Sequence, residues 1–335
     1  EILSLLSDKP TNKKNIGKEV YKKNLEDEYI QEVLSQSSES PKKIKVVLDC
    51  GNGSAGEIAP KLIRALGYEV IELFCEIDGN FPNHHPDPGK VENLQDLVQA
   101  VQENSADVGI AFDGDGDRLG VVTEKGEIIF PDQLMMIFTK DVLKNFPGKE
   151  IVFDVKCTNL LSNIIKESGG IPVMSPTGHF HIKNTLKQTN APLAGEMSGH
   201  IFFNDKWHGF DDGHYSAFRL LEIMHDLNIP LSSILGQLPK AFSTPELNIN
   251  IEEEKKFEIV KNFVDKAQFE GGSKVTIDGL RVDFDDGWGL IRASNTTPKL
   301  VLRFEAKTSS RLKEIKNMFL DQLKLIDETI QIDIS

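Results

Sequence analysis

The chain has 335 residues, of which 39% are hydrophobic, and this length and composition predict two or three domains with buried cores. Its formal net charge of −14 excludes nucleic acid as a bulk partner, because phosphate backbones require a broad basic face. We find no signal peptide and no apolar run of about 18 residues, so we expect a soluble, cytoplasmic protein without membrane contact. Three cysteines without metal or disulfide spacing fit a reducing compartment: Cys50, Cys75 and Cys157.

The first third of the chain predicts a layered α/β unit. A polar segment with a weak helical pattern at 26–36 and a Ser-rich linker at 35–41 precede it. Apolar runs then predict strands and helices in alternation, which is typical of α/β layers. The predicted strands are 44–48, 70–75, 106–112 and 119–123, and the predicted helices are 58–66 and 91–104.

Two further units follow. The second repeats the pattern of the first, with strands at 151–155 and 172–174 and helices at 159–168 and 214–226, so the two could be related copies. The last unit predicts a smaller α+β domain. Its predicted strands are 247–251, 274–277, 289–292 and 299–305, and its predicted helices are 254–267 and 310–325.

Asp113, Asp115 and Asp117 alternate with glycines in the sequence Asp-Gly-Asp-Gly-Asp-Arg. In an extended loop alternate side chains point the same way, and glycine lets the backbone fold tightly around a bound ion. Three adjacent carboxylates repel one another unless a cation lies between them, and an all-oxygen set favours Mg²⁺ over Zn²⁺. Arg118 adds a guanidinium suited to phosphate. The alternative is an ordinary Asp/Gly-rich hairpin turn.

A calcium-binding EF-hand loop is the sharper alternative for the same residues. The three aspartates fit its positions 1, 3 and 5, and Glu124 falls on position 12, but position 6 requires glycine and here is Arg118. The flanking segments 106–112 and 119–123 are rich in β-formers and too short for EF-hand helices. A strand–loop–strand metal site therefore fits better.

A glycine-rich loop, Gly51–Gly56, follows the first strand and opens a helix. It resembles a dinucleotide-binding fingerprint, with Glu72 at about the distance of a ribose-binding carboxylate. The alternative is a tight β–α turn that needs glycine only for its geometry. Asp49 at the end of the strand has no clear role in either interpretation.

Two other loops have a composition suited to sugar phosphates. Glu196 and Ser198, in Gly-Glu-Met-Ser-Gly-His, place a carboxylate and a hydroxyl that can grip vicinal sugar hydroxyls. Residues 292–298, Arg-Ala-Ser-Asn-Thr-Thr-Pro, combine an arginine with short polar side chains and turn amides that form an anion cradle. Satisfied polar turns explain both loops equally well.

Lys156 follows a predicted strand and His179 follows a Thr-Gly pair, and either could be an ordinary surface residue. His84 and His85 lie in a stiff proline-rich loop, where adjacent histidines rarely converge on a metal.

The three polar loops together resemble those of the α-D-phosphohexomutase family, in its phosphomannomutase/phosphoglucomutase branch. The resemblance covers essentially the whole chain, and Met197 favours the mannose/glucose branch. It implies two three-layer α/β domains followed by a smaller, TATA-binding-protein-like α+β domain. The implied boundaries are 26–127, 128–239 and 240–335, with 1–25 as a remnant of the connection from an absent first domain.

The resemblance also implies a role for each matching residue. The three aspartates would ligate one Mg²⁺, and Arg118 would reach the active-site phosphate. Glu196 and Ser198 would bind the sugar 3- and 4-hydroxyls, while His179 or His200 assists proton transfer. Lys156 and His179 would position the substrate. The non-transferred phosphate would be held by Arg292, Ser294, Asn295, Thr296 and Thr297.

The implied reaction interconverts hexose 1-phosphate and 6-phosphate through a phosphoserine and a glucose or mannose 1,6-bisphosphate. The family's Thr-Ala-Ser-His-Asn-Pro phosphoserine motif does not occur in the sequence, which begins with Glu1. We therefore expect these 335 residues to be inactive alone, with hexose phosphates and a phosphoserine domain supplied in trans as partners. Two alternatives stay open: an NAD-dependent enzyme using the Gly51–Gly56 loop, and a non-catalytic sugar-phosphate-binding module.

Overall fold

The computed structural model describes residues 18, 20, 24–37, 43–328 and 330. It divides the chain into one unit up to Gln36, which contains helix α2 (Leu25–Leu34), and a second from Ser37 onward. The predicted remnant at 1–25 lies almost wholly outside the described residues. None of the described helices is both long and apolar enough to cross a membrane.

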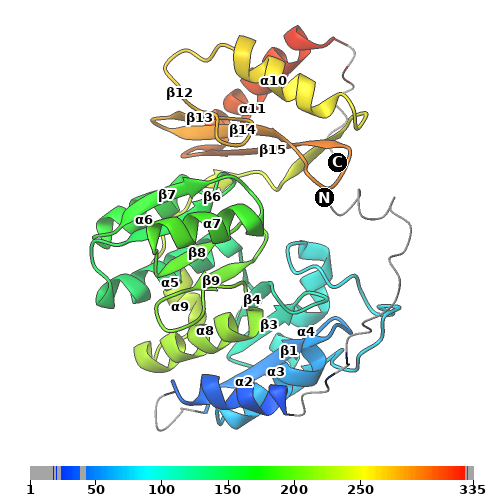
Figure 1. The fold of residues 1–335 in the computed structure, drawn as a ribbon, viewed down its shortest axis with the longest axis vertical. Helices are drawn as coiled ribbons and strands as arrows, with labels where there is room; N and C mark the ends of the chain where they lie inside the picture. Colours follow the sequence, from blue (N-terminus) through cyan, green and yellow to red (C-terminus); the bar gives the residue numbers. More distant parts are fainter. Residues whose placement is uncertain (1–17, 19, 21–23, 38–42, 329, 331–335) are drawn as a thin grey trace. The chain divides into compact units, whose positions relative to one another are not determined.

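The second unit opens with a five-stranded sheet of order β2-β1-β3-β4-β5. Its strands β1, β3 and β4 are labelled in Figure 1. β1 pairs in parallel with β2 and β3, and β4 runs antiparallel to β3 and β5. The strands are β1 (Lys45–Asp49), β2 (Glu69–Leu73), β3 (Val108–Phe112), β4 (Leu119–Thr123) and β5 (Ile128–Ile129).

Helices cover both faces of this sheet. They are α3 (Ala55–Ala65) and α4 (Gln95–Glu103), which follows a short 3₁₀ turn, η1 (Val91–Leu94). The β1–α3–β2 and β2–α4–β3 crossovers run in opposite directions across the sheet, so right-handed connections place the two helices on opposite faces. Leu97 and Val101 of α4 pack against Val47 and Val122 of the sheet.

A four-stranded sheet repeats this arrangement, with order β7-β6-β8-β9. β6 again pairs in parallel with two neighbours, and β9 runs antiparallel to β8. Its elements are α5 (Pro131–Asn145), β6 (Glu150–Asp154), α6 (Asn159–Glu167), β7 (Ile171–Ser175), α7 (His179–Thr189), β8 (Leu193–Gly195), β9 (Ile201–Phe203), α8 (Gly213–Leu227) and α9 (Leu231–Gly236). The shared order supports the interpretation of two related copies.

The C-terminal part of the second unit contains a six-stranded, antiparallel sheet. Its two helices pack against strands that include β14 and β15. Aromatic and aliphatic side chains, with Phe263, Phe304 and Phe319 at the centre, form its core. Its elements are β10 (Phe242–Ser243), β11 (Leu247–Asn250), α10 (Lys256–Lys266), β12 (Ser273–Val275), β13 (Leu280–Phe284), β14 (Gly287–Ala293), β15 (Lys299–Ala306) and α11 (Ser309–Ile326). The predicted fold class, two α/β domains and a smaller α+β domain, is confirmed.

The structure adds elements that the sequence patterns did not indicate. Ten of the fifteen residues of helix α5 are buried, and these include the polar Asp132 and Thr139, so its apolar and polar residues do not separate cleanly into two faces. Helix α7, which begins at His179, was not among the helices predicted from the sequence. Strand β13 contains the fully buried Arg281, which breaks the apolar pattern expected of a central strand.

Candidate active site

The predicted metal loop connects β3 to β4 and brings its three aspartates together. One carboxylate oxygen from each of Asp113, Asp115 and Asp117 lies within 4.8 Å of the others. Gly116, with φ of 81°, makes the turn that this approach requires. The strand–loop–strand setting predicted from the flanks is confirmed, and the EF-hand alternative is excluded because strands flank the loop on both sides.

Asp113 also organises the loop itself. Its Oδ1 accepts hydrogen bonds from the amides of Gly116 and Arg118 at 3.1 and 3.0 Å, and Arg118 Nε donates to its Oδ2 at 2.5 Å. Arg118 Nη1 pairs with Asp87 at 3.0 Å. Burial works to lower the pKa of Arg118, but the Asp113 carboxylate outweighs it and raises that pKa. The guanidinium is therefore a fixed cation beside the triplet.

The triplet fits a hard divalent cation. Asp117 Oδ1 is buried and lacks a well-aligned hydrogen bond from the described residues, although His200 Nε2 lies 3.3 Å away as an ion-pair partner. Three carboxylates this close repel one another, and a bound cation would relieve that repulsion. The donors are all carboxylate oxygens, as Mg²⁺ prefers. The residues present are therefore suited to hold such an ion.

The second predicted loop connects β8 to β9, the position topologically equivalent to that of the metal loop. Glu196 is 2% exposed and its Oε1 accepts from the Gly178 amide at 2.6 Å, while Oε2 is buried without a hydrogen bond inside the described chain. Burial, together with the neighbouring Asp154, raises the pKa of Glu196. Ser198 Oγ lies 2.7 Å from His200 Nδ1.

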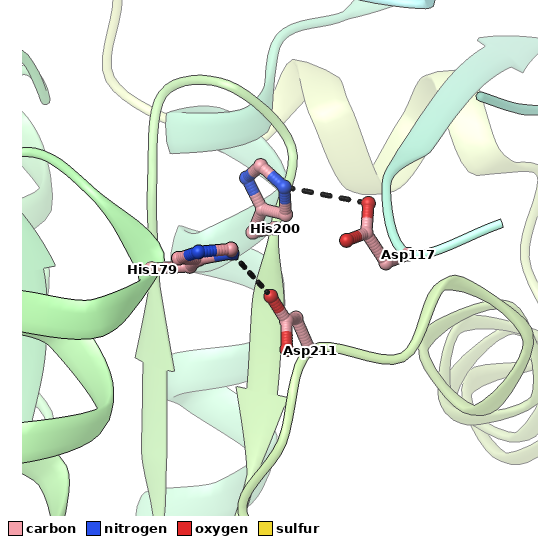
Figure 2. Close-up of side chains that lie close together, drawn as sticks. All are labelled: Asp117, His179, His200 and Asp211. Atoms are coloured by element: carbon pink, nitrogen blue, oxygen red, sulfur yellow. Dashed lines mark ion pairs between the residues drawn. The ribbon is translucent and has the colours of Figure 1, made fainter. Parts of the chain in front are cut away.

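The two loops meet through their backbones. Arg118 and His200 form an isolated antiparallel β-bridge, and the Leu119 amide donates to the Gly199 carbonyl at 3.2 Å. His200 Nε2 consequently lies 3.3 Å from Asp117 Oδ1 (Figure 2). Burial works to lower the pKa of His200, but Asp117 and Glu196 raise it. The imidazole is thus held beside both the metal loop and the sugar-type loop.

Lys156 follows β6 and is 8% exposed, so it is not the ordinary surface residue that sequence alone allowed. Its Nζ pairs with Glu246 Oε2 at 3.1 Å. Burial works to lower the pKa of Lys156, but Asp154 and Glu246 raise it despite the opposing charge of Arg292. The Lys156 ammonium therefore interacts electrostatically with Arg292 of the phosphate-type loop.

The phosphate-type loop connects β14 to β15 and is a hydroxyl-capped turn. Ser294 Oγ accepts from the amides of Thr296 and Thr297, at 3.3 and 3.1 Å, and from Thr297 Oγ1 at 2.8 Å. These two amides are therefore engaged within the loop, in contrast to the open amide cradle that the sequence suggested. Asn295, Thr296 and Thr297 are exposed beside the buried Arg292.

Asp278 links this loop to the region of His179. Its Oδ2 accepts from Arg292 Nε at 2.9 Å and from the Thr177 amide at 3.0 Å. Gly178, the next residue, donates to Glu196. Backbone and side-chain hydrogen bonds therefore connect all three predicted loops.

Three carboxylates that organise these loops were not indicated by the sequence patterns. Asp154, fully buried at the end of β6, accepts from Thr177 Oγ1 and the Met197 amide at 3.1 and 3.2 Å. Asp211 accompanies His179, and Asp278 orients Arg292. A signal existed only for Asp154, because a carboxylate at the carboxyl end of a parallel strand lies where ligands bind.

The Gly51–Gly56 loop is a structural β–α turn. The Ser54 and Asn52 amides donate to the carbonyls of Gly114 and Phe74, at 3.0 and 2.8 Å, and so are not free for a pyrophosphate. A Cβ at Gly53 would lie 2.7 Å from the Gly114 oxygen. Glu72 pairs with Arg64 at 2.6 Å. The dinucleotide interpretation is not supported.

Comparison with known proteins agrees with this geometry. The chain matches phosphoglucomutase/phosphomannomutase alpha/beta/alpha domain II over residues 27–126, domain III over residues 130–242 and the C-terminal domain over residues 246–322. A crystal structure of a family protein from Burkholderia thailandensis is similar, with a TM-score of 0.86 and 48% identity over 92% of this chain and 66% of that one.

Curated relatives are also similar in sequence. A phosphomannomutase/phosphoglucomutase of Pseudomonas putida is 51% identical over 99% of this chain and 72% of its own length. That of Pseudomonas aeruginosa is 56% identical over 87% of this chain, which covers 63% of it. The chain thus spans about two thirds of the length of these relatives. It belongs to the phosphoglucomutase/phosphomannomutase family.

Proposed function

We propose that this chain supplies the metal, sugar and phosphate sites of a phosphohexomutase that interconverts the 1- and 6-phosphates of glucose or mannose. The observation that carries the proposal is the Arg118–His200 bridge, which joins the acidic triplet to the Glu196–His200 loop. The names of the relatives in two Pseudomonas species support the reaction class.

Each site has a proposed role. Asp113, Asp115 and Asp117 hold Mg²⁺, which neutralises charge on the phosphoryl group. Arg118 contacts the same phosphate, and Glu196 and Ser198 bind the sugar 3- and 4-hydroxyls. The phosphate that is not transferred is held by Arg292, Ser294, Asn295, Thr296 and Thr297.

Lys156 and His179 position the substrate, and His200 moves a proton to or from the reacting hydroxyl. The raised pKa of His200 supports this role, because Asp117 favours the protonated ring while Ser198 contacts its other nitrogen. We further propose a 1,6-bisphosphate intermediate that reverses its orientation between two transfers. We also propose that the chain divides into three domains, at residues 26–127, 128–239 and 240–335.

We also propose that residues 1–335 require a phosphoserine donor in trans. The test measures conversion of glucose 1-phosphate and mannose 1-phosphate with Mg²⁺ and glucose 1,6-bisphosphate. It is run with and without a polypeptide carrying the family's phosphoserine motif. We expect little turnover alone and turnover on addition, with loss of that turnover in Arg292→Ala. Substantial turnover without the added polypeptide contradicts the requirement for a donor. Sugar-phosphate binding without rescue favours the non-catalytic module instead.

A further inference from the structure

Four side chains converge beside the acidic triplet: Asp117, His179, His200 and Asp211 (Figure 2). One potential ligand atom from each lies within 4.8 Å of the other three. His179 Nδ1 is 3.4 Å from Asp211 Oδ2, and His200 Nε2 is 3.3 Å from Asp117 Oδ1. The set offers two imidazole nitrogens and two carboxylate oxygens, so its chemistry differs from that of the triplet.

Isolated β-bridges and a helix start fix the backbone positions of His200, Asp211 and His179. His200 bridges to Arg118, next to Asp117, and Asp211 bridges to Phe202 in β9. His179 is the first residue of α7 and follows Gly178, whose φ of 123° sets the start of the helix. His179 is the exposed member, with 58% of its side chain accessible, and it can reorient.

Two buried oxygens of this cluster face its histidines without a well-aligned hydrogen bond from the described residues. Asp211 Oδ2 lies 3.4 Å from His179 Nδ1 and Asp117 Oδ1 lies 3.3 Å from His200 Nε2, as ion-pair partners. Only 8% of the Asp211 side chain is exposed. Lys183 holds the other oxygen, Oδ1, at 2.8 Å, which leaves Oδ2 directed at His179. An oriented carboxylate with one oxygen held by a neighbouring residue is typical of metal ligands.

We propose that Asp117, His179, His200 and Asp211 form a binding site for a transition-metal dication such as Zn²⁺. Imidazole nitrogen suits Zn²⁺, Ni²⁺ and Cu²⁺, whereas Mg²⁺ selects oxygen. In a tetrahedral zinc site the ligand atoms lie about 3.4 Å apart, as bonds of about 2.0–2.2 Å require. Two pairs already have this separation, and small side-chain rotations bring in the others.

Occupancy of this site affects the proposed mutase. Asp117 belongs to both clusters, so a transition metal competes with Mg²⁺ for that carboxylate. It also occupies the space where the proposed function places His179 and His200 against substrate, so we expect it to inhibit. The expected inhibition rests on the proposed function, but the binding of the metal does not. An experiment can therefore contradict the metal site without contradicting the mutase function, and the reverse.

The test measures Zn²⁺ affinity by calorimetry for the unmodified chain and four variants. His179→Asn and Asp211→Asn each remove one ligand from the proposed site. Asp115→Asn changes the acidic triplet alone. His181→Asn is the matched control, because His181 lies on the same helix, is exposed, and is not part of the cluster. Proton NMR of the imidazole rings reports which histidines the metal perturbs, and circular dichroism checks folding.

We expect His179→Asn and Asp211→Asn to weaken Zn²⁺ binding by at least about tenfold. Asp115→Asn and His181→Asn should retain it, and Zn²⁺ should shift the ring signals of His179 and His200. Unchanged affinity in both ligand variants overturns the proposal, as does loss of binding in Asp115→Asn alone, which would assign the metal to the triplet. An equal loss in His181→Asn also overturns it.

Discussion

Arg118 and His200 pair across an isolated β-bridge, although they belong to loops of two different sheets. Each lies at the end of the loop that follows the third strand of its sheet, β3 in one and β8 in the other. The repeated topology therefore places two equivalent loops opposite each other. One loop carries three carboxylates, and the other carries Glu196, Ser198 and His200.

The acidic triplet should bind Mg²⁺. We expect Asp115→Asn and Asp117→Asn each to reduce Mg²⁺ affinity by at least about tenfold, because each removes one charged ligand. Calorimetry measures the affinity. Asp321→Asn, on the exposed side of α11, is the matched control and should bind normally. Equal affinity in all three variants would place the cation elsewhere.

Asp278 should position Arg292. In Asp278→Asn the arginine loses a charged partner at 2.9 Å, and such hydrogen bonds contribute about 1.5–3 kcal/mol. We expect the affinity for glucose 1-phosphate to fall about tenfold, as calorimetry would show. Asp285→Asn changes an exposed residue of the neighbouring β13–β14 turn and should have no effect. A normal affinity in Asp278→Asn would show that Arg292 needs no such support.

Glu246 should compete with a sugar phosphate for Lys156. The pair measures 3.1 Å, and 43% of the Glu246 side chain is exposed, so solvent screens it to at most about 1 kcal/mol. We expect Glu246→Gln to strengthen binding of glucose 1-phosphate by up to about fivefold. Glu252→Gln, which removes an exposed partner of Lys255, serves as the control. Weaker binding in Glu246→Gln would mean that the pair positions Lys156 instead.

His84 should make stability depend on pH. The Asp49 carboxylate raises the pKa of His84 to about 9 from 6.5, because the buried anion accepts a hydrogen bond from the charged ring. A raised pKa contributes stability that is complete below pH 6.5 and is lost as the pH rises through about 9. The contribution is at most about 3 kcal/mol.

Urea denaturation at several pH values measures this contribution. His84→Gln retains a neutral donor but does not titrate, so the difference in unfolding free energy between the two proteins should shrink as the pH rises from 6.5 to 9. A difference that stays constant over this range would show that His84 does not carry its proton in the folded protein.

Gly56 should contribute to the stability of the fold. A Cβ at this position would collide with the carbonyl oxygen of Cys75, whereas one at Gly79 meets nothing within 4 Å. We expect Gly56→Ala to lower the unfolding free energy by about 1–3 kcal/mol and Gly79→Ala to change it little. Equal stability of the two variants in urea would show that the backbone absorbs the extra methyl group.

Much of the fold could be predicted from the sequence because the spacing of apolar residues within a short segment indicates a helix or a strand. The buried strand at Lys45–Asp49 and the amphipathic helix at Gln95–Glu103 both carry clear apolar patterns. The pattern was absent where packing was unusual. Helix α5 buries the polar Asp132 and Thr139 together with its apolar residues. Strand β13 places Arg281 in the interior, where Nη1 donates to the carbonyls of Val155 and Cys157.

The sequence by itself determined the chemistry of the loops, because residue type fixes which ligands a carboxylate, hydroxyl or guanidinium can bind. Only the tertiary structure decided which of these groups share a site. Asp211 and Asp278 lie far along the chain from Asp117 and Thr177, and no spacing rule relates them. Cys50 and Cys75 illustrate the same point, since their sulfurs lie 3.2 Å apart only because β1 and β2 are parallel neighbours. Strand order and crossover handedness, which are global properties of the packed chain, set these proximities.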